Sequence, residues 1–111
     1  MNALKYEAEC WEEVRKGVFR RIVHLEKLMT VIFEFRNGPW GEAEPFHSHP
    51  HEQTCYIAKG KINLYCEGEP DQQLSEGDLF YIPSGKKHTI QVLSEIARLV
   101  DSFSPIREDF L

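Results

Sequence analysis

The chain has 111 residues, the size of one domain with a single core. Its formal net charge is −5, from 13 basic and 18 acidic residues, and it has no Lys/Arg run or basic stripe, which argues against nucleic acid as a partner. Its three cysteines have no C-x-x-C spacing, so reduced thiols are favoured over a disulfide framework. Because neither a signal peptide nor an apolar run of membrane-spanning length is evident, we expect a soluble, cytoplasmic protein with no membrane partner.

The first part of the chain contains two strand-like segments that follow a polar arm. Residues 1–14 form the arm, in which Trp11 is the main anchor. Residues 18–25 and 28–35 are rich in β-branched and aromatic side chains, and a Glu-Lys pair separates them, which predicts two paired strands. Glycine, proline and asparagine between residues 36 and 45 then predict a loop that leads to the first of several histidines.

The rest of the chain predicts a series of short strands. These cover residues 53–58, 61–66, 72–75, 79–83, 88–92 and 96–103, and the end from 106 to 111 forms either a helical turn or coil. The segment 61–66 runs into a turn at 67–71, and a hairpin is the simplest interpretation. Turn signals about every 8–12 residues, with no helical period, predict an all-β barrel or sandwich.

Four potential metal donors stand at spacings that a β structure can bring together. His47 and His49 are two residues apart, so a strand would point both to one face, and a bend at Pro50 would let Gln53 rejoin them. His88 comes just after a later Ser-Gly turn and can face the same cavity. Imidazole nitrogens and amide oxygens both bind divalent ions, so we expect one divalent metal ion here. These donors suit Ni, Zn, Mn, Fe or Co and do not select among them.

The spacing of these residues and of nearby glycines resembles the two motifs of the cupin superfamily. The first motif is met by Gly41, His47, His49, Gln53 and Gly60, and the second by Gly77, Pro83, Gly85 and His88. Gln53 stands where many cupins carry glutamate, and Val92 replaces a motif asparagine. The resemblance implies a single-domain double-stranded β-helix, or jelly-roll barrel, over residues 1–111, with 1–14 as an N-terminal arm and 104–111 as a C-terminal tail.

The end of the chain carries a narrower resemblance. VDSFSPIREDFL, together with HSHPHEQ, is similar to the small cupins of pectin and alginate breakdown that act on 4,5-unsaturated monouronates. The resemblance implies that Asp101, Phe103 and Arg107 line a pocket beside the metal, and alternation from Leu99 puts the first two on one face of the last strand. Arg107 would bind the substrate carboxylate, Asp101 would move a proton, and Phe103 would pack on the sugar.

The implied reaction is an isomerisation with no redox step. Opening of the cyclic unsaturated monouronate at its hemiacetal leaves an enol, and proton transfer to carbon then gives the linear 4-deoxy-5-keto-uronate. The metal would stabilise negative charge that develops on the enol oxygen. The substrate is therefore a small anionic sugar, derived from either pectin or alginate.

Each candidate residue also has a purely structural interpretation. Gln53 could make a local hydrogen bond on its strand. Asp101 could cap a turn or pair with a lysine, and Arg107 could be a solvated charge or bind Asp101 itself. Such interpretations would remove the acid/base and carboxylate-binding roles.

Other side chains near the site are ambiguous. Trp40 either closes over a ligand or packs within its loop, and His51, outside the motif spacing, either supports the site from behind or is exposed. Cys55 is more simply a small buried hydrophobe than a thiolate ligand, and His24 a plain strand residue. The core or the pocket walls are expected to contain Phe33, Phe35, Tyr56, Tyr65, Phe80 and Tyr81.

Three function classes follow from this sequence. The first is the metal-dependent, non-redox enzyme acting on unsaturated uronates. The second is a metal-dependent dioxygenase, which cupins with open iron sites also support, and the third is a sugar- or metal-binding module without turnover. Small cupins commonly pair through an N-terminal strand, so the apolar segment 28–35 makes a homodimer the expected state.

Overall fold

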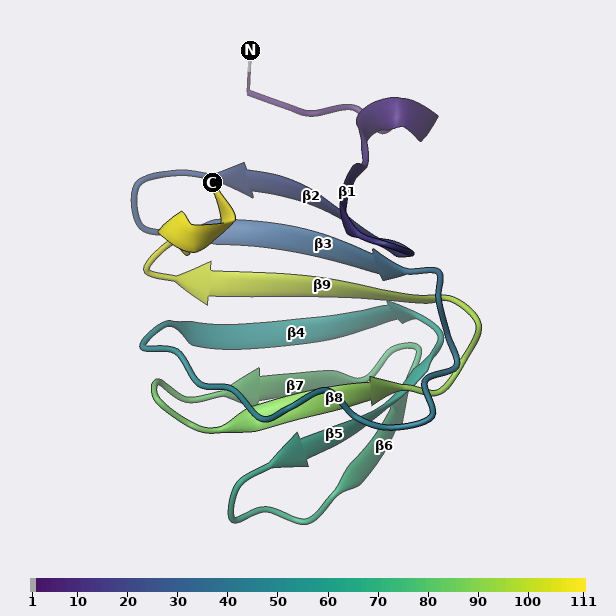
Figure 1. The fold of residues 1–111 in the computed structure, drawn as a ribbon. Coiled ribbons are helices and arrows are strands. Elements are labelled where there is room, and N and C mark those ends of the chain that lie inside the picture. The colour runs from purple at the N-terminus through teal and green to yellow at the C-terminus, as the bar shows by residue number, and fades with distance from the viewer. Residues whose placement is uncertain (1) are drawn as a thin grey trace.

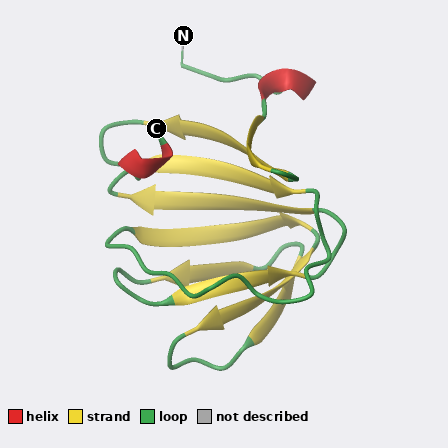
Figure 2. Cartoon of the chain, viewed as in Figure 1, coloured by secondary structure: helices red, strands yellow, loops and turns green. Residues whose placement is uncertain are grey.

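The computed structural model describes residues 2–111, in which the chain forms two antiparallel sheets (Figures 1 and 2). The larger sheet has six strands in the order β1 (Glu12–Arg15), β2 (Val18–His24), β3 (Met29–Phe35), β9 (Ala97–Ser104), β4 (Glu52–Lys59) and β7 (Leu79–Ile82). The smaller sheet has three strands in the order β6 (Gln72–Ser75), β5 (Lys61–Cys66) and β8 (His88–Val92). Two short 3-10 turns, η1 (Ala8–Cys10) and η2 (Glu108–Phe110), complete the described elements. The all-β prediction is confirmed.

The predicted pair of strands at the start of the chain is confirmed, and it has one more neighbour than the sequence predicted. β2 and β3 pair antiparallel from Val18↔Phe35 to His24↔Met29. β1 overlaps the end of the predicted arm, extends one residue beyond it, and pairs with β2 through Glu12↔Arg20. All four residues of β1 are exposed, so the strand has no apolar alternation by which a sequence pattern could reveal it.

The turn at Gly60 passes the chain from the larger sheet to the smaller one. β4 pairs with β7 and β9, whereas β5 pairs with β6 across the predicted turn and with β8. Gly60 has φ +85°, and a Cβ added there would lie 2.4 Å from the Ile96 carbonyl oxygen. Only glycine meets both requirements, because other residues are strained at positive φ and need the space that Ile96 occupies.

The loop after β3 lies along β8 (Figure 1). The backbone N–H of Trp40 donates to the Val92 carbonyl at 2.8 Å. His47 and His88 exchange backbone hydrogen bonds of 3.0 and 2.9 Å. The strand predicted through His47 and His49 is therefore reduced to a single β-bridge at His47. That bridge is sufficient to place the first histidine beside the last one.

The concave faces of the sheets enclose the apolar core. Along β9 the buried side chains alternate, and they are Ala97, Leu99, Asp101 and Phe103, as the alternation from Leu99 predicted. The chain then turns back at η2, where the Phe110 ring packs edge-on against Phe33 and Phe103 at centroid distances of 5.8 Å. The predicted core roles of Tyr56 and Tyr81 are wrong, because both project from the opposite faces of their strands and are 44% and 77% exposed. No helix within residues 2–111 is long and apolar enough to cross a membrane.

Candidate metal centre and substrate pocket

Three histidine side chains converge at the end of the loop that follows β3. His47 and His49 come from this loop and His88 from the start of β8. Their ring centroids are 4.4 Å apart for His47 and His88 and 5.1 Å apart for His49 and His88. One potential ligand atom from each ring lies within 4.8 Å of the others, a span that a single ion can bridge.

The local hydrogen bonds fix which ring nitrogen faces the centre. His49 Nδ1 lies 2.9 Å from the carbonyl oxygen of His51, and His88 Nδ1 lies 2.8 Å from that of Lys86. A carbonyl oxygen can only accept, so each Nδ1 carries the hydrogen and each Nε2 keeps its lone pair. Burial lowers the pKa of all three rings, for His88 to about 4, so they are neutral at pH 7.

Gln53 presents its amide oxygen to the same centre. Its Nε2 donates to Asp101 Oδ1 at 2.9 Å, which turns Oε1 toward His49, 3.2 Å from the ring Nε2. Both of these facing atoms carry lone pairs, because the His49 hydrogen is on Nδ1, and two buried acceptors at this distance repel each other. A cation between them removes that repulsion. The donor set therefore fits a divalent ion on chemical grounds, and the predicted bend at Pro50 does return Gln53 to the histidines.

Asp101 is a buried carboxyl group directly behind Gln53. It projects from β9 with 5% of its surface exposed. Burial raises its pKa to about 6, although the Gln53 and Cys55 side chains and the charge of Arg107 favour the ionised form. Asp101 does not cap a turn or pair with a lysine, so those structural interpretations are wrong. A carboxyl with such a pKa can both take up and release a proton near neutral pH.

Arg107 and Phe103 lie against the same cavity. The Arg107 guanidinium pairs with Asp109, with Nη2 2.8 Å from Oδ2, and holds the pKa of that carboxyl below its usual range. It also lies over the rings of Phe103 and Phe110, at 5.3 and 4.2 Å from their centroids. The predicted alternative of an Arg107–Asp101 ion pair is not formed, so Asp101 keeps a carboxylate oxygen free of arginine.

One cavity of about 310 Å³ is lined by His47, His88, Gln53, Asp101 and Arg107. Its walls are mostly apolar and aromatic, from Phe33, Phe35, Trp40, Phe80, Leu99, Phe103 and Phe110. Small-ligand sites in proteins combine such walls with a few placed polar groups, and this volume is at the small end of their range. Cys55 is 1% exposed with a pKa raised by burial, so it is the buried hydrophobe that was expected.

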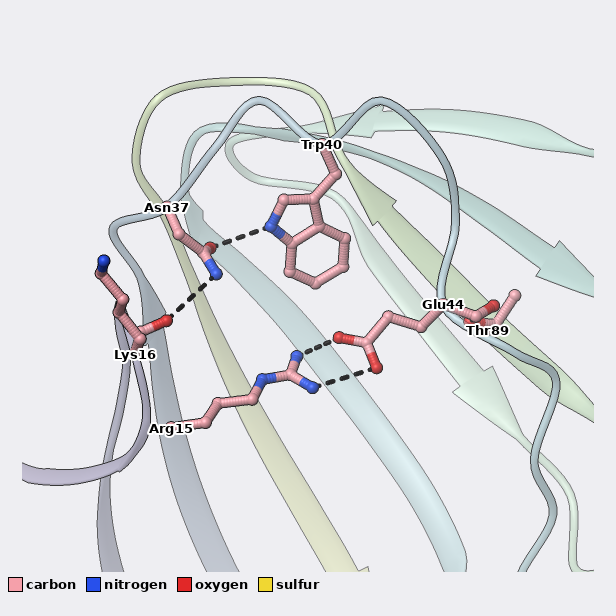
Figure 3. A network of polar contacts seen from close by, with 6 residues as sticks. All are labelled: Arg15, Lys16, Asn37, Trp40, Glu44 and Thr89. Carbon is pink, nitrogen blue, oxygen red and sulfur yellow. Dashed lines mark hydrogen bonds and ion pairs between the residues drawn. The ribbon is translucent and has the colours of Figure 1, made fainter.

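A network of polar contacts joins several residues that line the cavity (Figure 3). Arg15 on β1 and Glu44 in the loop point toward each other and form an ion pair. The Thr89 hydroxyl donates to the Glu44 carbonyl at 2.8 Å, and the Trp40 indole N–H donates to Asn37 Oδ1 at 2.9 Å. Trp40 therefore packs within its loop and also lines the cavity, whereas its closure over a ligand stays a prediction.

Other residues have smaller roles. His51 is partly buried, and its contribution to the cluster is the carbonyl oxygen that orients His49. His24 is an exposed residue at the end of β2. Sequence reasoning missed several cavity residues, among them Arg20 and Phe110. The alternation of Val18, Arg20 and Ile22 on β2 was a usable signal for Arg20, since residues two apart share a face.

Comparison with known proteins gives matches over most of the chain. A family model described as the cupin domain matches residues 37–103. The chain is 36% identical over 103 residues to the pectin degradation protein KdgF of Dickeya dadantii, which covers 91% of this chain and 90% of that protein. Among solved structures, KdgF from Halomonas sp. is 34% identical with a TM-score of 0.80, covering 91% of this chain and 90% of that one. An RmlC-like cupin from Shewanella frigidimarina is 28% identical with a TM-score of 0.82, covering 96% and 94%.

Proposed function

Because this chain belongs to the cupin family, with the jelly-roll barrel expected of it, we propose that it is a metal-dependent isomerase of 4,5-unsaturated monouronates. Its product is the linear 4-deoxy-5-keto-uronate. The observation that carries this proposal is the buried Asp101, held by Gln53 beside a three-histidine cluster in a monosaccharide-sized cavity. The name of the Dickeya dadantii relative supports a pectin-derived substrate over an alginate-derived one.

The metal ligands in this proposal are His47, His49, Gln53 and His88. The neutral rings and the facing lone pairs of His49 and Gln53 support this set. When bound, a divalent ion supplies Lewis-acid stabilisation of negative charge on substrate oxygen. The four ligands carry no charge of their own, so the full charge of the ion acts on an anionic sugar.

The remaining site residues handle the substrate and its proton. Arg107 offers a planar fork to the carboxylate, and its stacking on Phe103 and Phe110 keeps that fork in one orientation. Phe103 supplies an apolar surface for a sugar face. Asp101 accepts the proton that the hydroxyl loses as the ring opens and delivers it to the carbon of the former double bond, so no net proton, electron or water is consumed.

The experiment is a spectrophotometric assay on pectin- and alginate-derived unsaturated monouronates. We expect loss of the ultraviolet absorbance of the conjugated double bond, with no oxygen consumed and with a divalent metal present in the same sample. Iron-dependent oxygen uptake would instead identify a dioxygenase, and tight sugar binding without spectral change would identify a binding module. Either result overturns the proposal.

We also propose that the protein is cytoplasmic and forms a homodimer. The free thiols of Cys10, Cys55 and Cys66 support a reducing compartment. The exposed side chains of Val23, Leu25 and Leu28 around the β2–β3 turn support a second copy as partner. Light scattering on the purified protein tests the dimer, and a monomeric mass at micromolar concentration refutes it.

A further inference from the structure

Arg20 is a cationic side chain inside the cavity that has no part in the proposed proton transfer. It projects from the middle of β2 onto the concave face, between the buried Val18 and the half-buried Ile22. Its side chain is 17% exposed. Cavity walls of this kind are usually apolar, and a guanidinium that is kept there loses part of its hydration. Such a group is well placed to donate hydrogen bonds to a bound molecule.

Two contacts hold the Arg20 guanidinium in one orientation. Nε lies 2.6 Å from Glu12 Oε1, and Nη2 donates to the Phe110 carbonyl at 3.0 Å. The Arg20 guanidinium lies over the Phe110 ring, 5.1 Å from the ring centroid. The Arg107 guanidinium also lies over this ring, at 4.2 Å. An arginine has five N–H donors. These contacts use two of them, and the others have no protein acceptor within residues 2–111.

The register of the sheet sets how far Arg20 is from β9, the strand that carries Asp101. Arg20 pairs with Phe33 on β3, which in turn pairs with Leu99 on β9. β2 is therefore two strands away from β9, which corresponds to about 10 Å across the sheet. Asp101 belongs to β9 and Gln53 to β4, the next strand, so these two residues and Arg20 lie on opposite sides of β3 in the sheet. A sugar ring between the two sides can contact both.

We propose that Arg20 is a further substrate-binding residue, which donates to the ring hydroxyl oxygens at the edge of the uronate remote from its carboxylate. This inference rests on the proposed function and adds the group that selects a sugar acid over a smaller carboxylate. Arg107 and the metal recognise features that any 2-hydroxy acid shares. Arg20 recognises the hydroxyl groups that only the full sugar carries there, and an unpaired donor left by a shorter ligand lowers its affinity.

A purely structural role makes a different prediction. If Arg20 only ties β1 and the C-terminal turn to the sheet, then removing the charge of its partner Glu12 should have the same effect on activity as replacing Arg20 itself. Glu12→Gln does this and leaves the guanidinium in the cavity, because Glu12 is largely exposed with 65% of its side chain accessible. It is thus the matched control for Arg20→Met, with Arg20→Lys as a milder variant that keeps the charge and loses the fork.

The experiment measures kcat and KM with the pectin-derived monouronate, and the dissociation constants of galacturonate and lactate for the metal-loaded protein by calorimetry. We expect Arg20→Met to raise KM and the galacturonate dissociation constant by about 10- to 100-fold, the size of a lost charge-assisted hydrogen bond. Lactate binding stays within about 2-fold, Glu12→Gln stays within about 3-fold of wild type in every readout, and Arg20→Lys is intermediate.

Three results overturn the assignment of Arg20. These are an Arg20→Met variant with wild-type KM and galacturonate affinity, a Glu12→Gln variant that reproduces its defect, and an equal loss of lactate and galacturonate binding. If Arg20→Met does not fold, Arg20→Lys decides by the same criteria. A wild-type protein that turns over neither monouronate refutes the proposed function, while the calorimetric pattern still decides whether Arg20 binds sugar hydroxyls.

Discussion

Replacing Asp101 by asparagine separates the chemical role of the carboxyl group from its effect on stability. The variant keeps the shape of the side chain and an oxygen that can accept from Gln53, whose Nε2 lies 2.9 Å away. It cannot carry the proton between oxygen and carbon. Loss of a general acid/base group lowers kcat by about 10²–10⁴-fold. We therefore expect this loss in the uronate assay with metal content unchanged.

The stability effect of the same variant has the opposite sign. Burial raises the Asp101 pKa from 3.8 to about 6, so the folded protein binds the proton more tightly than the unfolded chain does. Stability is thus lost as pH rises through this interval, and the ionised group costs about 3 kcal/mol at pH 7. Asparagine removes that cost but buries an amide N–H₂, which destabilises the fold by about 1–3 kcal/mol if it is unpaired. For the metal-free protein we expect the variant to equal wild type or exceed it by up to about 2 kcal/mol at pH 7.

Denaturant unfolding of both metal-free proteins at pH 7 and pH 4 provides the measurement. The difference in the free energy of unfolding between the variant and wild type should be less favourable to the variant at pH 4 than at pH 7. The reason is that the wild-type carboxyl is largely protonated in the folded state at pH 4. Wild-type turnover by Asp101→Asn would remove Asp101 from the mechanism. A variant that is several kcal/mol less stable at pH 7 would refute the argument that the buried charge is costly.

Three further substitutions test other parts of the structure. His88→Ala removes a ligand that joins the smaller sheet to the site, so metal affinity should fall more than about 10-fold and activity with it, as measured by metal analysis and the uronate assay; full metal retention would exclude His88 as a ligand. Gln53→Glu places a second carboxylate against Asp101, where the Gln53 amide now donates at 2.9 Å. The two carboxylates should share a proton, so the variant should keep its metal and shift the pH–rate profile upward, and an unshifted profile would contradict this. Glu34→Gln breaks ion pairs with Arg98 and Arg36 at 2.7 and 3.2 Å. Burial opposes ionisation of Glu34, but the two arginines together hold its pKa below 4.5, so its stabilisation is present above that pH and is lost as pH falls through the folded-state pKa. The variant should lose about 1–3 kcal/mol at pH 7 and progressively less as pH falls below 4.5, and a loss that does not change with pH would exclude the ion pairs as its cause.

The strands could be predicted wherever apolar alternation or turn chemistry was strong. β8 was predicted with its observed bounds, and Gly60, Gly77 and Gly85 have the positive φ values that tight turns require. β1 was not predicted, because this exposed edge strand has no buried face and therefore no apolar alternation in its sequence. Tyr56 and Tyr81 were placed in the core because aromatic residues are common there, yet their strands leave one face uncovered in this chain.

The site followed from spacing only in part. His47, His49 and His88 do converge, because the motif spacings reflect a turn and a bridge that the backbone has to make. The link between Gln53 and Asp101 could not be predicted, since it depends on the pairing of β4 with β9 across half the chain. The alternation on β2 could show which face Arg20 shares with Val18, but its place in the cavity also depends on the pairing of β2 with β3 and on the return of Phe110 at η2.

Because only a single β-bridge joins His47 to His88, the proposed ion would also link the two sheets. Gln53 belongs to the larger sheet and His88 to the smaller, and the loop carrying the other two histidines connects them. An ion held by all four would join segments that otherwise meet here mainly through three backbone hydrogen bonds, two between His47 and His88 and one from the Gly85 N–H to the His49 carbonyl. Ligand occupancy at a thousand times its dissociation constant adds about 4 kcal/mol to folding. Removal of the metal by a chelator should therefore loosen the contact between the histidine loop and β8 before the rest of the barrel. The availability of metal in the cell would then affect the stability of the fold as well as its catalysis.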